Sequence, residues 1–227
     1  MYYTISPTWK DETCVILACG PSVATQDLSL LAGKRVIAIN DAWRLYPKAD
    51  VLFSGDWRFF RDNPDLSGYK GPMIACVSPE SFDKIRDKRK VHIGRGPRRG
   101  LTYNRTKVAG QYTCVGQAAN FAFHRGCNLI ALVGVDLCPA NDGRRYAISE
   151  ELVDEEVLHT YEQMRGNLRF LGAAAKEAGI AIRAVGLGSR VEGVPKFKDL
   201  ASALETPVSL NKKPIEFRRK PVWRRLR

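Results

Sequence analysis

Residues 14–22 read Cys-Val-Ile-Leu-Ala-Cys-Gly-Pro-Ser, and this stretch decides the fold. A short apolar run that stops at turn residues is typical of a strand buried on both faces of a sheet. Runs of the same kind recur at 35–39, 50–53, 72–77, 128–135 and 180–185. The chain therefore offers several buried strands, of which 128–135 is apolar nearly throughout.

Segments with helical patterns separate these runs, at 27–31, 79–88, 113–125 and 151–178. Alternation of buried strands and helices indicates βαβ units. We therefore predict an α/β fold, an open and mostly parallel Rossmann-like sheet with helices on both faces. Residues 94–110 are rich in Gly and Arg and show no period, which predicts a loop.

Length and composition indicate one α/β domain, predicted at residues 1–210, followed by a basic tail at 211–227. The 227 residues are 44% apolar, which is enough for one sizeable core. No stretch approaches the roughly 18 apolar residues of a membrane span, so no transmembrane segment is expected. The N-terminus also lacks the layout of a signal peptide, and we expect a cytoplasmic protein.

The positive charge is concentrated at the C-terminal end. Residues 211–227 carry +7 of the formal net charge of +12, and Pro214 and Pro221 disfavour a helix there. This segment is predicted to be an arm that recruits an acidic partner, such as DNA, a glycan or a lipopolysaccharide. A solubilising or subunit-docking tail is the alternative, and the oligomeric state stays open, a homo-oligomer included.

The cysteines indicate neither a metal site nor a disulfide framework. Six of them are present without a C-x-x-C pair, and several lie inside apolar runs. We predict reduced and mostly buried thiols, as is usual in a cytosolic protein.

Small or polar residues follow three consecutive strands, at Gly20-Pro21-Ser22, Asn40-Asp41 and Gly55-Asp56. Ligands of open parallel sheets bind beyond the carboxyl ends of the strands, so these groups are predicted to line one ligand site. Gly20 lets a ligand come close to the backbone, and Ser22 is predicted to cap a helix whose free N–H groups suit a phosphate. Each group is also ordinary turn or helix-cap chemistry. Neither a P-loop nor a dinucleotide fingerprint follows the first strand.

Several segments in the same order resemble a known superfamily. They are 15–22, 37–40, 51–56, 111–115 and 126–136, the last ending in Gly134-Val135-Asp136. Together they resemble the bacterial family-42 sialyltransferases and the related archaeal 6-hydroxymethylpterin diphosphokinase-like proteins, a superfamily that includes domain of unknown function 115. Arg145-Tyr146-Ala147 and His159 also fall where the sialyltransferases carry a Tyr-Ala and a general-base histidine. The resemblance spans roughly residues 13–187.

The resemblance implies a glycosyltransferase that moves a sugar from a CMP-linked donor to an acceptor hydroxyl, with no tightly bound cofactor and no metal. Tyr146 would steady the leaving phosphate, and His159 would deprotonate the acceptor, which suits a side chain that titrates near neutral pH. The residues implied to hold the nucleotide are Gly20, Pro21, Ser22, Asn40, Thr113 and Cys114.

Two departures keep other functions open. Cys114 stands where a serine is expected, and Gly55-Asp56 replaces an Asn-Pro. An aspartate there suits the diphosphokinase-like branch, in which Asp56 and Asp136 would hold Mg²⁺ between the phosphates of ATP. A third class is a non-catalytic nucleic-acid-binding protein that uses the tail and the arginines of residues 95–105; its DNA binding would weaken steeply with salt.

Overall fold

The computed structural model describes residues 1–110 and 113–208, so the predicted tail at 211–227 lies outside the described residues. The strands are β1 (Thr13–Leu17), β2 (Arg35–Ile39), β3 (Val51–Ser54), β4 (Met73–Ala75), β5 (Lys90–His92), β6 (Gly94–Arg95), β7 (Lys107–Val108), β8 (Leu129–Val133), β9 (Ala181–Val185) and β10 (Lys196–Phe197). The α-helices are α1 (Trp57–Asp62), α2 (Pro79–Lys84), α3 (Cys114–Arg125), α4 (Glu155–Glu177) and α5 (Leu200–Glu205). Short 3₁₀ helices are η1 (Pro21–Thr25), η2 (Leu28–Leu31) and η3 (Asn40–Arg44).

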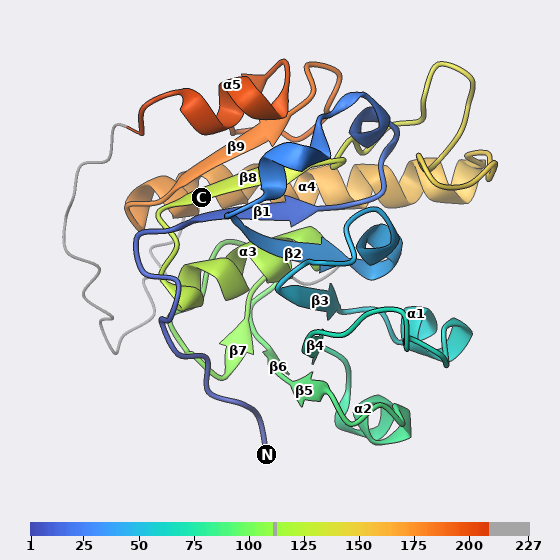
Figure 1. Ribbon diagram of the computed structural model, residues 1–227, viewed down its shortest axis with the longest axis vertical. Coiled ribbons are helices and arrows are strands. Elements are labelled where there is room, and N and C mark those ends of the chain that lie inside the picture. The colour runs from blue at the N-terminus through green and yellow to red at the C-terminus, as the bar shows by residue number, and fades with distance from the viewer. Residues whose placement is uncertain (111–112, 209–227) are drawn as a thin grey trace.

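The described residues form an eight-stranded sheet in the order β10-β9-β8-β1-β2-β3-β4-β5, in which every pairing is parallel (Figure 1). β1 lies near the middle, between β2 and β8. Its side chains alternate between two cores: Cys14 and Ile16 face one cluster, and Val15 and Leu17 face the other. The apolar runs are continuous because both faces of these strands are buried.

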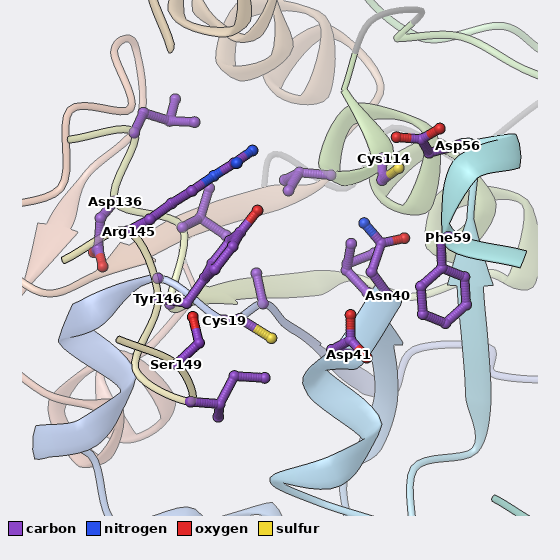
Figure 2. Close-up of a pocket in the computed structure, with 18 of the residues that line it drawn as sticks. Cys19, Asn40, Asp41, Asp56, Phe59, Cys114, Asp136, Arg145, Tyr146 and Ser149 are labelled. Carbon is purple, nitrogen blue, oxygen red and sulfur yellow. The ribbon is translucent and has the colours of Figure 1, made fainter. Parts of the chain in front are cut away.

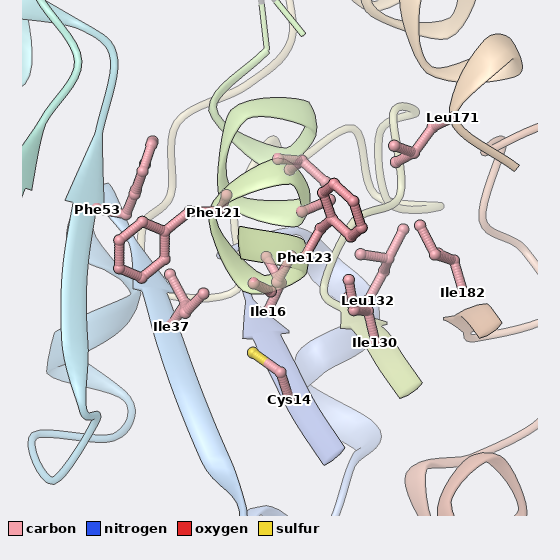
Figure 3. Close-up of a cluster of buried hydrophobic side chains, with 14 of the residues drawn as sticks. Cys14, Ile16, Ile37, Phe53, Phe121, Phe123, Ile130, Leu132, Leu171 and Ile182 are labelled. Carbon is pink, nitrogen blue, oxygen red and sulfur yellow. The ribbon is translucent and has the colours of Figure 1, made fainter. Parts of the chain in front are cut away.

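Helices cover both faces of the sheet. α3 and α4 pack on one face, where Phe121 and Phe123 of α3 and Leu171 of α4 meet Ile16 of β1 and Leu132 of β8 (Figure 3). On the other face, residues of η1, η2, α1 and α5 join the second core; they include Val23, Leu31, Phe59, Phe60 and Leu200. The predicted fold class, an open parallel sheet with helices on both faces, is confirmed.

Some predicted boundaries were wrong. The strand predicted at 72–77 is β4, and the helix predicted at 79–88 ends at Lys84. Residues 94–110, predicted as a loop, contain the two-stranded ladder of β6 and β7. That segment is anchored by Asn120 of α3, whose Oδ1 accepts hydrogen bonds from the backbone N–H of Thr102 (3.0 Å) and of Ala109 (2.7 Å). A single side chain therefore holds much of this segment in place. Hydrogen bonds of this kind leave no periodic pattern in the sequence.

The order of the strands reverses beside β1. From β1 the chain proceeds through β2, β3, β4 and β5 toward one edge of the sheet, and β8, β9 and β10 then extend the sheet in the other direction. The chain therefore leaves β1 and β8 toward opposite edges of the sheet. In open α/β sheets, ligands bind beyond the carboxyl ends of the strands at such a reversal. No helix in residues 1–110 and 113–208 combines the length and the apolar character that a membrane span requires.

Candidate functional site

A cavity of about 570 Å³ lies at this reversal point, on the carboxyl edge of the sheet. The ends of β1, β2 and β8, the starts of α1 and α3, and the connection from β8 to α4 contribute to its walls (Figure 2). Of the residues predicted from the sequence to form a site, the structure brings together Gly20, Pro21, Asn40, Asp41, Asp56, Thr113, Cys114, Asp136 and Tyr146. Ser22 and His159 do not line the cavity.

At Gly20, the connection leaving β1 packs against the one leaving β8. Its N–H donates to the carbonyl of Gly134 at 2.8 Å. A Cβ atom at position 20 would lie 2.4 Å from the Gly134 carbonyl oxygen and 2.5 Å from Oδ2 of Asp136. Real Cβ atoms do not approach other atoms so closely, so glycine is required here for close packing of two backbones.

Asp136 sits directly against this glycine, and its side chain is buried. Its Oδ2 accepts a hydrogen bond of 2.7 Å from the backbone N–H of Ser22. The first turn of η1 is thus capped by Asp136, and the prediction that Ser22 caps a helix with free amides for a phosphate was wrong. Ser22 lies inside η1, and its hydroxyl points toward Gly186 rather than into the cavity.

The second carboxylate oxygen of Asp136, Oδ1, is buried and has no hydrogen-bond partner among the described residues. Burial raises the pKa of Asp136, and the hydrogen bond from Ser22 opposes that rise. A buried acceptor without a donor is costly and uncommon in folded proteins, so it marks a place where a ligand donor would be stabilised.

Replacing Asp136 with Asn is expected to stabilise the fold at pH 8, because an amide keeps an oxygen for the Ser22 N–H without burying a charge. Burial makes the Asp136 carboxylate less favourable in the folded state than in the unfolded chain, so the stability of the wild type rises as the pH falls through the raised pKa toward the ordinary aspartate range. The advantage of Asp136→Asn should therefore be a few degrees in Tm at pH 8 and should vanish near pH 4. Melting curves across this range check it; an advantage that persists at pH 4 would contradict it.

Asn40 supplies a second buried acceptor at the end of β2. Its backbone adopts a left-handed conformation with φ of 50°, which is uncommon for any residue other than glycine. Its Oδ1 is buried and has no partner among the described residues, although the residue lines the cavity. A strained backbone together with an unpaired acceptor is a combination that binding sites often contain.

The N-terminus of α3 forms another wall. Thr113 caps the helix by accepting a hydrogen bond of 2.9 Å from the N–H of Gly116, and Sγ of Cys114 accepts one of 3.3 Å from the N–H of Gly55. The helix is 12 residues long, and its first turn carries amide donors and a positive dipole end that favour an anion. Burial raises the pKa of the Cys114 thiol, so at neutral pH it is a protonated packing group rather than a nucleophile.

Asp56 and Asp136 lie on opposite sides of the cavity (Figure 2). Asp56 caps α1 by accepting from the N–H of Arg58 at 2.9 Å, and its carboxylate also forms an ion pair of 3.1 Å with the Arg58 side chain. The geometry therefore does not bring these two carboxylates together around one Mg²⁺ ion. In residues 1–110 and 113–208, no three His, Cys, Asp or Glu side chains are grouped to hold a metal.

The connection from β8 to α4 carries Tyr146 into the cavity. An antiparallel bridge between Arg144 and Leu152 closes part of this connection, and the N–H of Ala147 donates to the carbonyl of Cys19 at 2.8 Å. Burial raises the pKa of Tyr146 to about 12, opposed by the nearby Arg145. The phenol is therefore a hydrogen-bond donor at neutral pH.

His159 lies on an exposed face of α4. Its Nε2 is 2.8 Å from Nε2 of Gln163, one turn further along the helix. The same helix instead presents Thr160, Tyr161 and Met164 to the cavity. His159 therefore lies on a different face of α4 from the residues that line the cavity. Its role as general base stays a prediction.

Several lining residues did not enter the predicted site, among them Cys19, Arg44, Phe59, Arg145, Glu151 and Tyr161. A signal existed for Arg145, which directly precedes Tyr146, and for Cys19, which directly precedes Gly20. Glu151 had none, because it reaches the cavity only through the turn that joins it to Arg145, where the Arg145 N–H donates to the Glu151 carbonyl at 2.7 Å.

Comparison with known proteins finds a structural likeness but no sequence family. No family model matches the chain, and no curated protein matches it. Among solved structures, the fold is similar to that of MAf glycosyltransferase from Magnetospirillum magneticum AMB-1, with a TM-score of 0.58 and 16% sequence identity. The match covers 92% of this chain and 37% of that chain. At this identity the likeness establishes a shared α/β fold, in which this chain corresponds to little more than a third of the larger protein.

Proposed function

We propose that the cavity binds a nucleotide-sugar, CMP-linked, and that the protein transfers the sugar to an acceptor hydroxyl. The observation that carries this proposal is the pair of buried, unpaired acceptors, Asn40 Oδ1 and Asp136 Oδ1, at the edge of a cavity that also receives the N-terminus of α3. The acceptors suit hydroxyl and amino groups of a nucleoside and a sugar, and the helix end suits a phosphate. The resemblance in sequence and the fold of the glycosyltransferase named above support the same assignment.

In such a transfer, the acceptor oxygen attacks the anomeric carbon while the bond from that carbon to the phosphate oxygen breaks. The electron pair leaves with the phosphate as CMP, and the acceptor proton passes to a base. The Tyr146 hydroxyl, protonated at neutral pH, would donate a hydrogen bond to the departing phosphate, as would the first amides of α3. Fixed donors of this kind stabilise negative charge as it develops.

Two side chains are candidates for the base. His159 is the one that the resemblance implies, and it would act only on an acceptor bound over the exposed face of α4. Asp136 lines the cavity. Burial raises the pKa of its carboxyl group, which makes its carboxylate a stronger base than an ordinary aspartate. The cavity geometry favours Asp136, and we propose it as the proton acceptor.

Binding of nucleotides by wild type and Asn40→Gly tests the proposal. Glycine accepts the left-handed backbone at position 40 without strain, so this variant removes the side chain while the fold stays stable. We expect CMP to bind the wild type without Mg²⁺ and to lose affinity about ten-fold in Asn40→Gly. Titration calorimetry with CMP, UDP and ATP, each with and without Mg²⁺, measures this. ATP binding that requires Mg²⁺, with none of CMP, would overturn it in favour of a diphosphokinase.

The same proposal extends to the substrate that accepts the sugar. An acidic acceptor, whether a glycan, a lipopolysaccharide or DNA, would be recruited through residues 211–227, which carry +7. This part of the chain lies outside the described residues, so its role stays a prediction from charge alone. The nucleotide site does not depend on it.

A further inference from the structure

Among the described residues, three arginines line the cavity, and each is paired with a carboxylate that also lines it. The pairs are Arg44 with Asp41 (3.1 Å), Arg58 with Asp56 (3.1 Å) and Arg145 with Glu151 (2.6 Å). The carboxylates therefore offset the positive charge that would otherwise attract an anion. A phosphate that enters this cavity must share or replace one of these partners.

Arg145 differs from the other two in its surroundings. Its side chain is 27% exposed, against 49% for Arg44 and 73% for Arg58. Its Nε is buried and has no hydrogen-bond partner among the described residues. A guanidinium that is partly desolvated and holds a spare donor gains more from an anion than one in open solvent.

The position of Arg145 is fixed on one side by Tyr146. The guanidinium carbon lies 4.8 Å from the centre of the Tyr146 ring, and the two side chains extend side by side into the pocket (Figure 2). The hydroxyl proposed above to meet the leaving phosphate and the charge of Arg145 thus come from adjacent residues and face the same space. A cation stacked on an aromatic face loses little freedom when it binds a ligand.

Glu151 reaches Arg145 across the turn that the Arg144–Leu152 bridge closes. The Glu151 side chain is 50% exposed, and the backbone bond from Arg145 to Glu151 is independent of the carboxylate. Its carboxylate can therefore swing into solvent without a change in the backbone, whereas Arg145 stays where it is. Another anion can therefore take the place of the Glu151 carboxylate beside Arg145.

We propose that Arg145 binds the donor phosphate through its guanidinium and that Glu151 competes with this phosphate for the same cation. The assignment rests on the proposed function in one respect, that the anion is the phosphate of a nucleotide. Arg145 adds a charge-assisted contact to those of Tyr146 and α3. Glu151 lowers the affinity of the site for any anion and so sets how readily the product phosphate leaves.

The test compares Glu151→Gln with a matched control, Glu150→Gln. Glu150 is adjacent, its side chain is 92% exposed, and its nearest cation is Arg144 at 4.0 Å, so the control removes the same charge without touching Arg145. Calorimetric titrations of the full chain with CMP, cytidine and inorganic pyrophosphate give the affinities, and melting curves establish that each variant is folded. Arg145→Ala completes the set.

We expect Glu151→Gln to bind CMP roughly five-fold more tightly than wild type, since a partly exposed ion pair is worth about 1 kcal/mol. Glu150→Gln should match wild type, Arg145→Ala should lose about ten-fold, and cytidine, which has no phosphate, should show no such differences. CMP binding that is equal in the two glutamine variants would overturn the role of Glu151 while leaving the proposed function intact. Pyrophosphate binding that follows Arg145 and Glu151 without nucleotide binding would uphold the anion site and overturn the proposed function. Binding of neither probe would overturn both.

Discussion

Gly20→Ala is expected to abolish CMP binding and to destabilise the fold by about 3 kcal/mol, because a Cβ atom has no space at the end of β1. That atom would lie 2.4 Å from the Gly134 carbonyl oxygen and 2.5 Å from the Asp136 carboxylate, so the connections leaving β1 and β8 would have to separate. Separation would break the hydrogen bond from Ser22 to Asp136, which holds one wall of the cavity. Thermal melting and titration with CMP measure the two effects.

Gly166→Ala is the matched control for this substitution. A Cβ atom at Gly166, within α4, would meet no atom within 4 Å, and alanine is the better helix former. This variant should keep full CMP affinity and gain about 0.5–1 kcal/mol of stability. A Gly20→Ala protein as stable as the wild type, with unchanged CMP affinity, would show that the two connections are not held as tightly as the geometry requires.

Asp136→Asn is expected to lower the rate of sugar transfer by about a hundred-fold or more while CMP still binds, because an amide cannot accept the acceptor proton. His159→Ala, in contrast, should change the rate by less than about three-fold, since the imidazole lies outside the cavity. Hydrolysis of CMP-sialic acid in the absence of an acceptor provides a rate for both variants. Loss of turnover in His159→Ala with activity retained in Asp136→Asn would reverse the assignment and return the role to the histidine.

The fold was predictable because its signal is local. The apolar runs at 14–19 and 128–135 include most of β1 and all of β8, which are buried on both faces, and such strands are apolar nearly throughout. The glycine that follows β1 and the amide residue that follows β2 were equally recognisable in the sequence. Both come at strand ends, which lie together at the carboxyl edge of a parallel sheet. The sequence therefore located the part of the cavity wall that follows these strands.

The interactions across the site were not predictable, because they join residues far apart in the chain. Ser22 and Asp136 are 114 positions apart, and nothing near Ser22 indicates that a distant carboxylate caps η1. The exposed position of His159, however, was predictable from the spacing of the apolar residues in α4. Val157, Leu168 and Leu171 are buried at helical spacing, and His159 falls on the opposite side of that pattern. The resemblance matched a histidine at position 159, but a match in sequence does not show on which face of the helix that side chain lies.

The α3 end of the cavity shows the same limit. The helix predicted at 113–125 begins at Thr113, and this residue caps α3. The hydrogen bond from the Gly55 N–H to Cys114 was not predictable from the sequence, because it depends on how β3 and α3 are packed together. The sulfur atom of Cys114 accepts this hydrogen bond at the position where the resemblance leads to the expectation of a serine.

A crystal structure of the protein with CMP tests the central claim most directly. Electron density for the nucleotide is expected between β1, β2 and β8, with its phosphate within hydrogen-bond distance of the first amides of α3 and of Arg145, and with a donor of the nucleoside facing Asn40. Nucleotide bound elsewhere on the protein, or a phosphate placed away from both α3 and Arg145, would contradict it.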